Sequence, residues 1–111
     1  MWPKLGKKFW QRLSSGAELQ MHAEGTPLQA AKRFASKEAC AKALGVGIGT
    51  HLRFQDITIQ HGHGRKPTLS VCNAVLEKII PHNPDKIQLD LSLSDEYPYV
   101  QSFVVISLLH V

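Results

Sequence analysis

The stretch from Thr26 to Gly49 constrains the fold most, because it carries both the start and the stop signal of one long helix. Its first residue can cap a helix, Pro27 suits the first helical position, and Gln29 completes a capping box. Gly45 follows Leu44 where a left-handed terminating residue is expected. The sequence therefore predicts a helix of about 18 residues, roughly 27 Å long at 1.5 Å per residue.

This predicted helix is rich in alanine, which favours helix and lets another backbone come close. One set of apolar residues recurs at helical spacing, and we expect that face to belong to the core. The set consists of Leu28, Ala31, Ala35, Ala39 and Ala43.

The same helix carries charges at Arg33, Lys37, Glu38 and Lys42. Glu38 and Lys42 are four residues apart and therefore share a face. On spacing alone, such charges more often decorate a solvated face than build a site.

Length and composition indicate one small domain that spans residues 1–111. Of the 111 residues, 43% are hydrophobic, which is typical of a globular protein with one modest core. No run of about 18 apolar residues occurs, and the first lysines lead into polar residues instead of an apolar signal core. Cys40 and Cys72 lack the spacing of a disulfide framework or zinc site, so we expect reduced thiols. We therefore expect a cytoplasmic protein without a membrane partner.

The balance of charge favours an acidic partner. The net charge is +4 and the pI is about 9.3, which would suit nucleic acid or an acidic carrier protein. Basic and aromatic residues do not interleave as they do in nucleic-acid-binding surfaces, and no motif of that class is present. A small basic nucleic-acid-binding module therefore ranks last among the functions considered, and no nucleic acid partner is expected.

One shorter helix is predicted before the long helix and another after it. Leu5, Phe9 and Leu13 recur at helical spacing among basic and polar residues. Asn73–Ile80 forms the second helix, which Pro81 ends.

Four strands follow from the distribution of apolar and turn residues. Leu52–Gln60 and Pro67–Val71 flank the polar sequence HGHGRK and predict a hairpin. Ile87–Leu93 alternates cleanly, and the long apolar Tyr99–His110 predicts a central or interface strand, paired with it as an antiparallel hairpin. The fold class expected is α+β, with one long helix packed on a small antiparallel sheet.

Two other patterns give weak chemical signals. His61 and His63 form an H-x-H pair suited to a metal, but no third ligand is near in sequence, which favours an exposed turn. Gly45, Gly47 and Gly49 follow a helix instead of opening one, which excludes a P-loop or dinucleotide fingerprint.

The sequence RFASKEACAKALGVGI, from Arg33 to Ile48, closely resembles the signature of the bacterial holo-acyl-carrier-protein synthases. These are the small trimeric type of 4'-phosphopantetheinyl transferase. The matching positions are Arg33, Phe34, Lys37, Glu38, Ala39, Lys42, Ala43, Leu44, Gly45, Gly47 and Ile48. The resemblance continues at Phe54, Asp56, Ile57, Gly64, Lys66, Pro67 and the SLSDE of 92–96.

The resemblance implies transfer of 4'-phosphopantetheine from coenzyme A to a serine of apo acyl carrier protein, which supports fatty acid biosynthesis. Such chemistry uses magnesium, held by one or two carboxylates together with phosphate oxygens and water. Glu38 matches the metal ligand of the family. Lys42 matches a catalytic lysine that helps deprotonate the serine or steadies the phosphates.

The resemblance also implies how coenzyme A is bound. Arg33 and Lys37 match candidates for contacts to its phosphates. Gly64, Lys66 and Pro67 match a hairpin turn near its nucleotide end, although an ordinary Gly-rich hairpin explains the glycine without a ligand.

Partners follow from the resemblance as well. In the family a basic helix docks on an acidic helix of the carrier protein, and Lys7, Lys8 and Arg12 suit that role. A solvated basic face is an equally good interpretation of these charges. The family is a homotrimer with shared active sites, and the apolar segment 99–110 suits an interface.

The chain departs from the family pattern in two places. Members begin with a strand that carries a Gly-x-Asp motif, whose aspartate is the other magnesium ligand and would fall before Met1. Ser94 and Asp95 stand where the family often has Ser-His. The alternatives are therefore a truncated or mis-started synthase, and a non-catalytic relative that binds coenzyme A or carrier protein.

Overall fold

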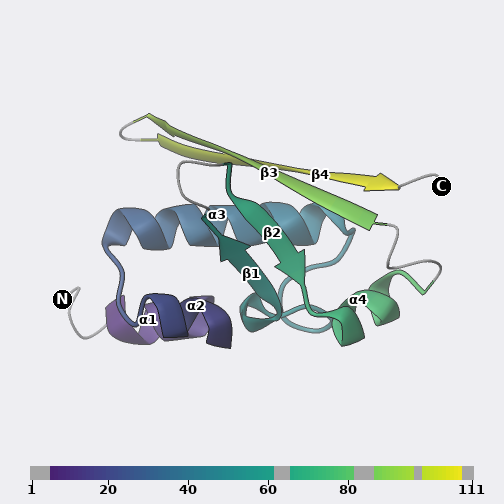
Figure 1. The fold of residues 1–111 in the computed structure, drawn as a ribbon, viewed down its shortest axis with the longest axis horizontal. Coiled ribbons are helices and arrows are strands. Elements are labelled where there is room, and N and C mark those ends of the chain that lie inside the picture. Colours follow the sequence, from purple (N-terminus) through teal and green to yellow (C-terminus); the bar gives the residue numbers. More distant parts are fainter. Residues whose placement is uncertain (1–5, 62–65, 82–86, 97–98, 109–111) are drawn as a thin grey trace.

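The computed structural model describes residues 6–61, 66–81, 87–96 and 99–108. The expected α+β class is confirmed: the described residues form α-helices and a sheet with strand order β1-β2-β3-β4 in which every described pairing is antiparallel, and the helices lie below the β3–β4 hairpin in Figure 1. The long helix α3 lies beneath the β3–β4 hairpin and packs chiefly on β4. The elements are α1 (Lys7–Leu13), α2 (Gly16–Met21), α3 (Pro27–Ala43), the 3-10 helix η2 (Phe54–Asp56), β1 (Ile57–Gln60), β2 (Thr68–Val71), α4 (Asn73–Ile79), β3 (Ile87–Glu96) and β4 (Tyr99–Leu108).

Helix α3 begins and ends as its sequence predicts. Gln29 donates its backbone N–H to the Thr26 hydroxyl over 3.2 Å, and its side-chain oxygen accepts the backbone N–H of Thr26 over 2.9 Å. The two bonds form the predicted capping box, with Pro27 in the first turn. At the other end Gly45 has φ of 76°, a conformation that glycine adopts without steric cost.

The core face predicted for this helix is wrong. Leu28, Ala31 and Ala43 are exposed, and Ala35 and Ala39 are only half-buried. Alanine occurs on nearly every side of this helix, so apolar periodicity does not choose one face. The residues that are buried instead include two polar ones: Ala30, Ser36, Lys37, Cys40 and Ala41.

The strand predicted over Leu52–Gln60 is shorter than expected. Residues 54–56 form η2, and only Ile57–Gln60 enters the sheet. The cause is local, because the Asp56 carboxylate accepts the backbone N–H of Arg53 over 2.9 Å and closes a turn.

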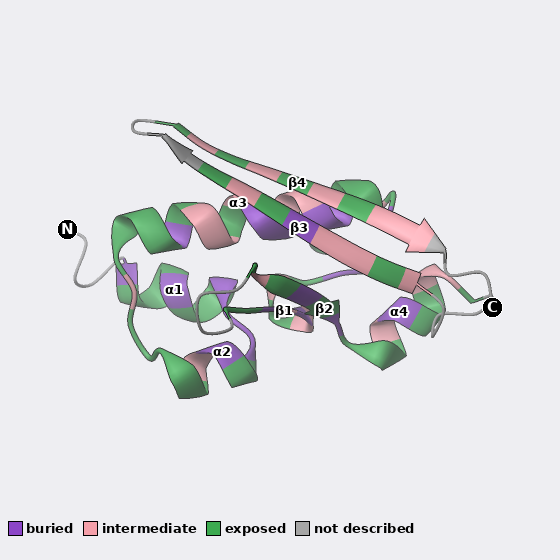
Figure 2. Ribbon diagram, turned by 45° about the horizontal axis from the view of Figure 1, so that its top comes forward, coloured by how far each residue is buried: buried purple, intermediate pink, exposed green. Residues whose placement is uncertain are grey.

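The terminal strand lies at an edge of the sheet, so the central position considered for it is wrong. The predicted antiparallel hairpin with β3 is confirmed, for example by Leu91 opposite Val104. Exposed and half-buried residues alternate along β4, so that one face of the strand is exposed (Figure 2). Tyr99, Phe103 and Val105 are 72%, 62% and 58% exposed.

The main core fills the space between α3, the sheet and α4, and a smaller cluster joins α1 to the start of α3. Trp10 and Leu13 of α1 pack with Ala30 in the smaller cluster. Among the described residues, no helix combines the length and apolar character needed to cross a bilayer. Both cysteines are free thiols, as expected; Cys40 is buried and Cys72 is exposed.

Candidate active site

Glu38 and Lys42 lie on the outward side of α3, one turn apart. Glu38 is half-buried and Lys42 is exposed. Neither has a hydrogen-bond or ion-pair partner in the part of the chain that the structure describes. An acidic and a basic side chain that no described neighbour engages are open to a ligand.

Lys37 precedes Glu38 in sequence but points into the protein, where its side chain has no exposed surface. Its ammonium donates to the carbonyl of Leu13 over 2.7 Å, to Glu18 Oε1 over 2.6 Å and to the carbonyl of Phe54 over 2.9 Å. All three donors of the ammonium are thereby used. The prediction that Lys37 contacts a coenzyme A phosphate does not fit this environment.

Glu18 is the partner of Lys37, and it is a residue that the sequence analysis missed. Its Oε1 accepts the backbone N–H of Ser15 over 2.7 Å, and its Oε2 accepts the backbone N–H of Ile59 over 3.0 Å. Ser15 and Glu18 also form a complete capping box at the start of α2. That Ser-x-x-Glu spacing is the signal that could have identified Glu18.

Burial changes the ionisation of this cluster. Desolvation lowers the pKa of Lys37 to about 8, although the hydrogen bond and charge of Glu18 oppose the shift. The pKa of Arg33 is lowered by burial too, and Glu18 again opposes the change. Burial raises the pKa of the nearby Cys40 thiol to about 12, which makes it a poor nucleophile.

Arg33 is held on the same inward side, between α1 and α2. Its guanidinium lies 3.9 Å from the centre of a Trp10 ring, and its Nη1 donates to the Ser14 hydroxyl over 2.6 Å. Its Nε is 3.4 Å from Glu18 Oε2. The side chain retains 10% exposure, so unlike Lys37 it still reaches a surface.

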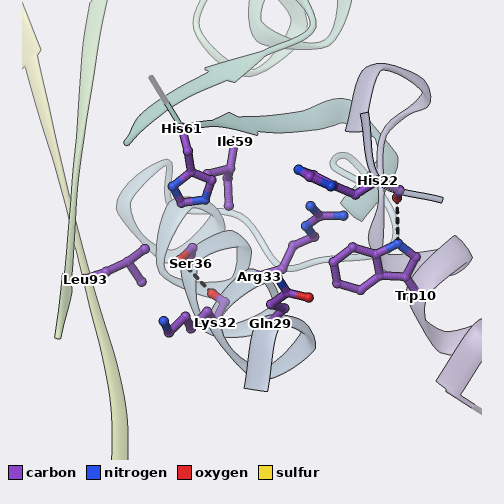
Figure 3. Close-up of a pocket in the computed structure, with 9 residues that line it drawn as sticks. All are labelled: Trp10, His22, Gln29, Lys32, Arg33, Ser36, Ile59, His61 and Leu93. Carbon is purple, nitrogen blue, oxygen red and sulfur yellow. Dashed lines mark hydrogen bonds between the residues drawn. The ribbon is translucent and has the colours of Figure 1, made fainter. Parts of the chain in front are cut away.

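That surface is the wall of a cavity of about 270 Å³. Figure 3 shows His61, at the end of β1, on the opposite side of this cavity from Trp10 and His22. The lining of the cavity includes two cationic and two imidazole side chains, and such side chains suit a phosphate-bearing ligand. The lining comprises Trp10, His22, Gln29, Lys32, Arg33, Ser36, Ile59, His61 and Leu93.

The predicted hairpin contacts are only partly described. Lys66 is exposed and Pro67 is half-buried just before β2. Gly64 and His63 lie outside the described residues, so the proposed H-x-H metal pair is untested. Within the described ranges no cluster of three or more His, Cys, Asp or Glu side chains is placed to hold a metal.

The basic residues Lys7, Lys8 and Arg12 of α1 are all exposed. Their helix is linked to α3 by a contact between tilted aromatic rings: Phe9 lies 6.3 Å from Phe34, measured between ring centroids. Phe34 lies one turn before Glu38 on α3. The basic residues therefore belong to the same region of the molecule as the outward carboxylate.

Sequence comparison identifies relatives of the whole chain. A family profile for the 4'-phosphopantetheinyl transferase superfamily matches residues 3–100. The holo-[acyl-carrier-protein] synthase of Bartonella bacilliformis is 42% identical over 108 residues, which cover 92% of this chain and 80% of the relative. That of Bartonella tribocorum is 35% identical over 111 residues, covering 96% of this chain and 83% of the relative.

Structural comparison agrees. The synthase of Neisseria meningitidis superposes with a TM-score of 0.75 at 36% identity, covering 96% of this chain and 85% of the other. The Helicobacter pylori synthase, solved in complex with coenzyme A, gives a TM-score of 0.73 at 29% identity, covering 96% and 87%. The chain therefore belongs to the holo-[acyl-carrier-protein] synthase family of 4'-phosphopantetheinyl transferases.

Proposed function

We propose that this protein transfers 4'-phosphopantetheine from coenzyme A to a serine of apo acyl carrier protein and releases 3',5'-adenosine bisphosphate. The observation that carries the proposal is the outward pair of Glu38 and Lys42, charged, one turn apart and engaged by no described neighbour. The names of the relatives support the reaction class, and one relative binds coenzyme A. The modified carrier would serve fatty acid biosynthesis in the cytoplasm.

Glu38 suits a magnesium site in which the substrate supplies some of the ligands. Magnesium is commonly bound by one or two carboxylates, with phosphate oxygens and water filling the other positions. Glu38 supplies one such carboxylate from a rigid helix. When bound, the ion would neutralise charge on the pyrophosphate. Lys42 would then steady the transferred phosphate or accept the proton of the attacking serine.

We place the phosphate-bearing nucleotide of coenzyme A in the cavity lined by Arg33. Its volume, about 270 Å³, is near the lower end for ligand pockets, so it suits part of a nucleotide. We propose that Arg33 contacts a phosphate of coenzyme A. Lys37 is not proposed as a phosphate contact, because its ammonium is buried and already bonded to three acceptors. The hairpin residues Gly64, Lys66 and Pro67 follow His61 of the cavity wall and remain candidates.

The cavity and the Glu38–Lys42 pair lie on different sides of α3, which supports a site built from more than one copy. In a homotrimer, the pair of one protomer would meet the cavity of its neighbour. The exposed apolar side of β4, with Tyr99, Phe103 and Val105, provides a surface that such an assembly would bury.

The experiment that tests the function is transfer of labelled phosphopantetheine from coenzyme A to purified apo acyl carrier protein with magnesium present. Transfer that stops when magnesium is chelated is the expected result. Binding of coenzyme A or carrier without transfer would overturn the proposal in favour of a non-catalytic relative. Binding of nucleic acid alone would overturn both.

Carrier docking is tested separately on α1. Replacing Lys7, Lys8 and Arg12 by Gln should weaken carrier binding at low salt, and the difference from wild type should shrink as salt rises. Gln11→Ala on the same helix is the matched control. A salt-independent loss, or none, would exclude these three side chains as the docking charges.

A further inference from the structure

The buried pair formed by Glu18 and Lys37 joins five separate segments. Lys37, on α3, bonds to the end of α1 through the Leu13 carbonyl, to α2 through Glu18 and to η2 through the Phe54 carbonyl. Glu18 adds β1 through the backbone N–H of Ile59. Every bond in this set lies between 2.6 and 3.0 Å.

The pair is directly linked to the proposed catalytic residues through α3. Lys37 is adjacent to Glu38 in the chain, and the two side chains leave the helix about 100° apart, Lys37 buried and Glu38 half-buried. A rotation of the helix that loosened Lys37 would therefore move Glu38 and Lys42 by a similar amount.

Apolar packing alone specifies this rotation poorly. Alanine occupies exposed, half-buried and buried positions on α3, so turning the helix exchanges one small apolar side chain for another. Hydrogen bonds depend on direction as well as distance, and in this orientation of the helix the ammonium reaches all three of its acceptors. The polar pair therefore supplies orientation that the alanines do not.

We propose that Glu18 and Lys37 are positioning residues: they fix the rotation of α3 and so place Glu38 and Lys42 for transfer. The inference rests on the proposed function of that outward pair. A buried ion pair adds little net stability, because removing both charges from water costs about as much free energy as their attraction returns. Its better-supported role is to specify one arrangement of the elements that it joins. Misplacing a reacting group by about 1 Å can slow a reaction a hundredfold.

The test compares Glu18→Gln, Lys37→Met and the double variant with wild type. Each single change leaves a buried charge with fewer partners in the interior, so both should lose stability, whereas the double variant removes the two charges together and should recover part of it. If the pair positions α3, kcat of the double variant stays about tenfold or more below wild type. Its KM for coenzyme A is measured separately, because Glu18 also contacts Arg33 of the cavity wall; the positioning role predicts the loss in kcat. Leu76→Ala, buried beneath the sheet, is the control that loses stability without touching the pair.

Two results would overturn the inference. One is a double variant that transfers at the wild-type kcat per folded molecule, which would make the pair purely structural. The other is a control that loses kcat in proportion to its stability. A wild-type chain that binds coenzyme A without transfer would refute the proposed function alone. In that case magnesium-dependent thermal stabilisation of the coenzyme A complex replaces kcat as the readout, and an unchanged shift in the double variant overturns the inference.

Discussion

The inward and outward sides of α3 both carry charged side chains, but the fold pairs the inward ones and leaves the outward ones unpaired within the described residues. Inward, the side chains of Arg33 and Lys37 are 10% and 0% exposed, and each is bonded to Glu18 or its neighbours. Outward, Glu38 and Lys42 have no partner among the described residues. The difference shows that the position of a charge on a helix does not by itself tell whether the fold pairs that charge or leaves it open.

The comparison also separates the free-energy cost of burying a charge from that of leaving it exposed to water. A charge without water must be met by the protein at every donor and acceptor, and here no buried side-chain nitrogen or oxygen within the described ranges lacks a partner. An exposed charge keeps its hydration and costs the fold little. Residues of the inward set should therefore affect stability, and residues of the outward set should affect chemistry.

The largest effect is expected from Lys37→Met. Removing one partner leaves Glu18 buried with fewer donors, which should lower the free energy of unfolding by about 3–5 kcal/mol. Lys42→Met, on the exposed side, should change it by less than about 0.5 kcal/mol. Urea denaturation measures both. Equal losses in the two variants would break the comparison.

Glu38→Gln should have the opposite profile. The neutral amide holds magnesium poorly, so kcat should fall by about a hundredfold or more, the scale of losing one preorganised electrostatic contact. The free energy of unfolding should stay within about 0.5 kcal/mol, as for other surface substitutions. Transfer assays and urea denaturation on one preparation give the two values. Unchanged transfer would remove Glu38 from the mechanism.

Gly25→Ala should have a smaller effect on the inward side. A methyl group there would collide with the Trp10 ring, which stacks on Arg33, so the ring must move at a cost of about 1–3 kcal/mol. Gly16→Ala is the matched control, because nothing lies within 4 Å of its added carbon. Thermal denaturation that ranks the two alike would show that the Trp10–Arg33 contact is loosely packed.

The smallest effect concerns pH. The pKa of Lys37 is about 8 in the folded protein and 10.5 when unperturbed, so above pH 8 the unfolded chain binds more protons. The free energy of unfolding should therefore rise between pH 8 and 9, by at most about 1 kcal/mol. Above pH 9 the raised pKa of Cys40 works in the other direction, because only the unfolded thiol ionises there. The same titration of Lys37→Met should lack the rise; a rise that persists would assign it to another group.

Local signals in the sequence were sufficient for much of the fold. The caps of α3, Gly45 after its last turn, α4 and the β3–β4 hairpin follow from residues close together in the chain, and all are confirmed. The β1–β2 hairpin was also predicted, with β1 shorter than expected. That Glu38 and Lys42 share a face follows from helical spacing in the same way.

What the sequence by itself determined is therefore where helices and strands form and which chemistry the chain resembles. Only the tertiary structure decided which side of α3 is buried. The physical reason is that an alanine-rich helix has little apolar contrast between its sides, so the choice falls to partners far away in sequence. Glu18, Leu13 and Phe54 supply the acceptors that make Lys37 an interior residue, and the burial of Lys37 turns its neighbour Glu38 outward.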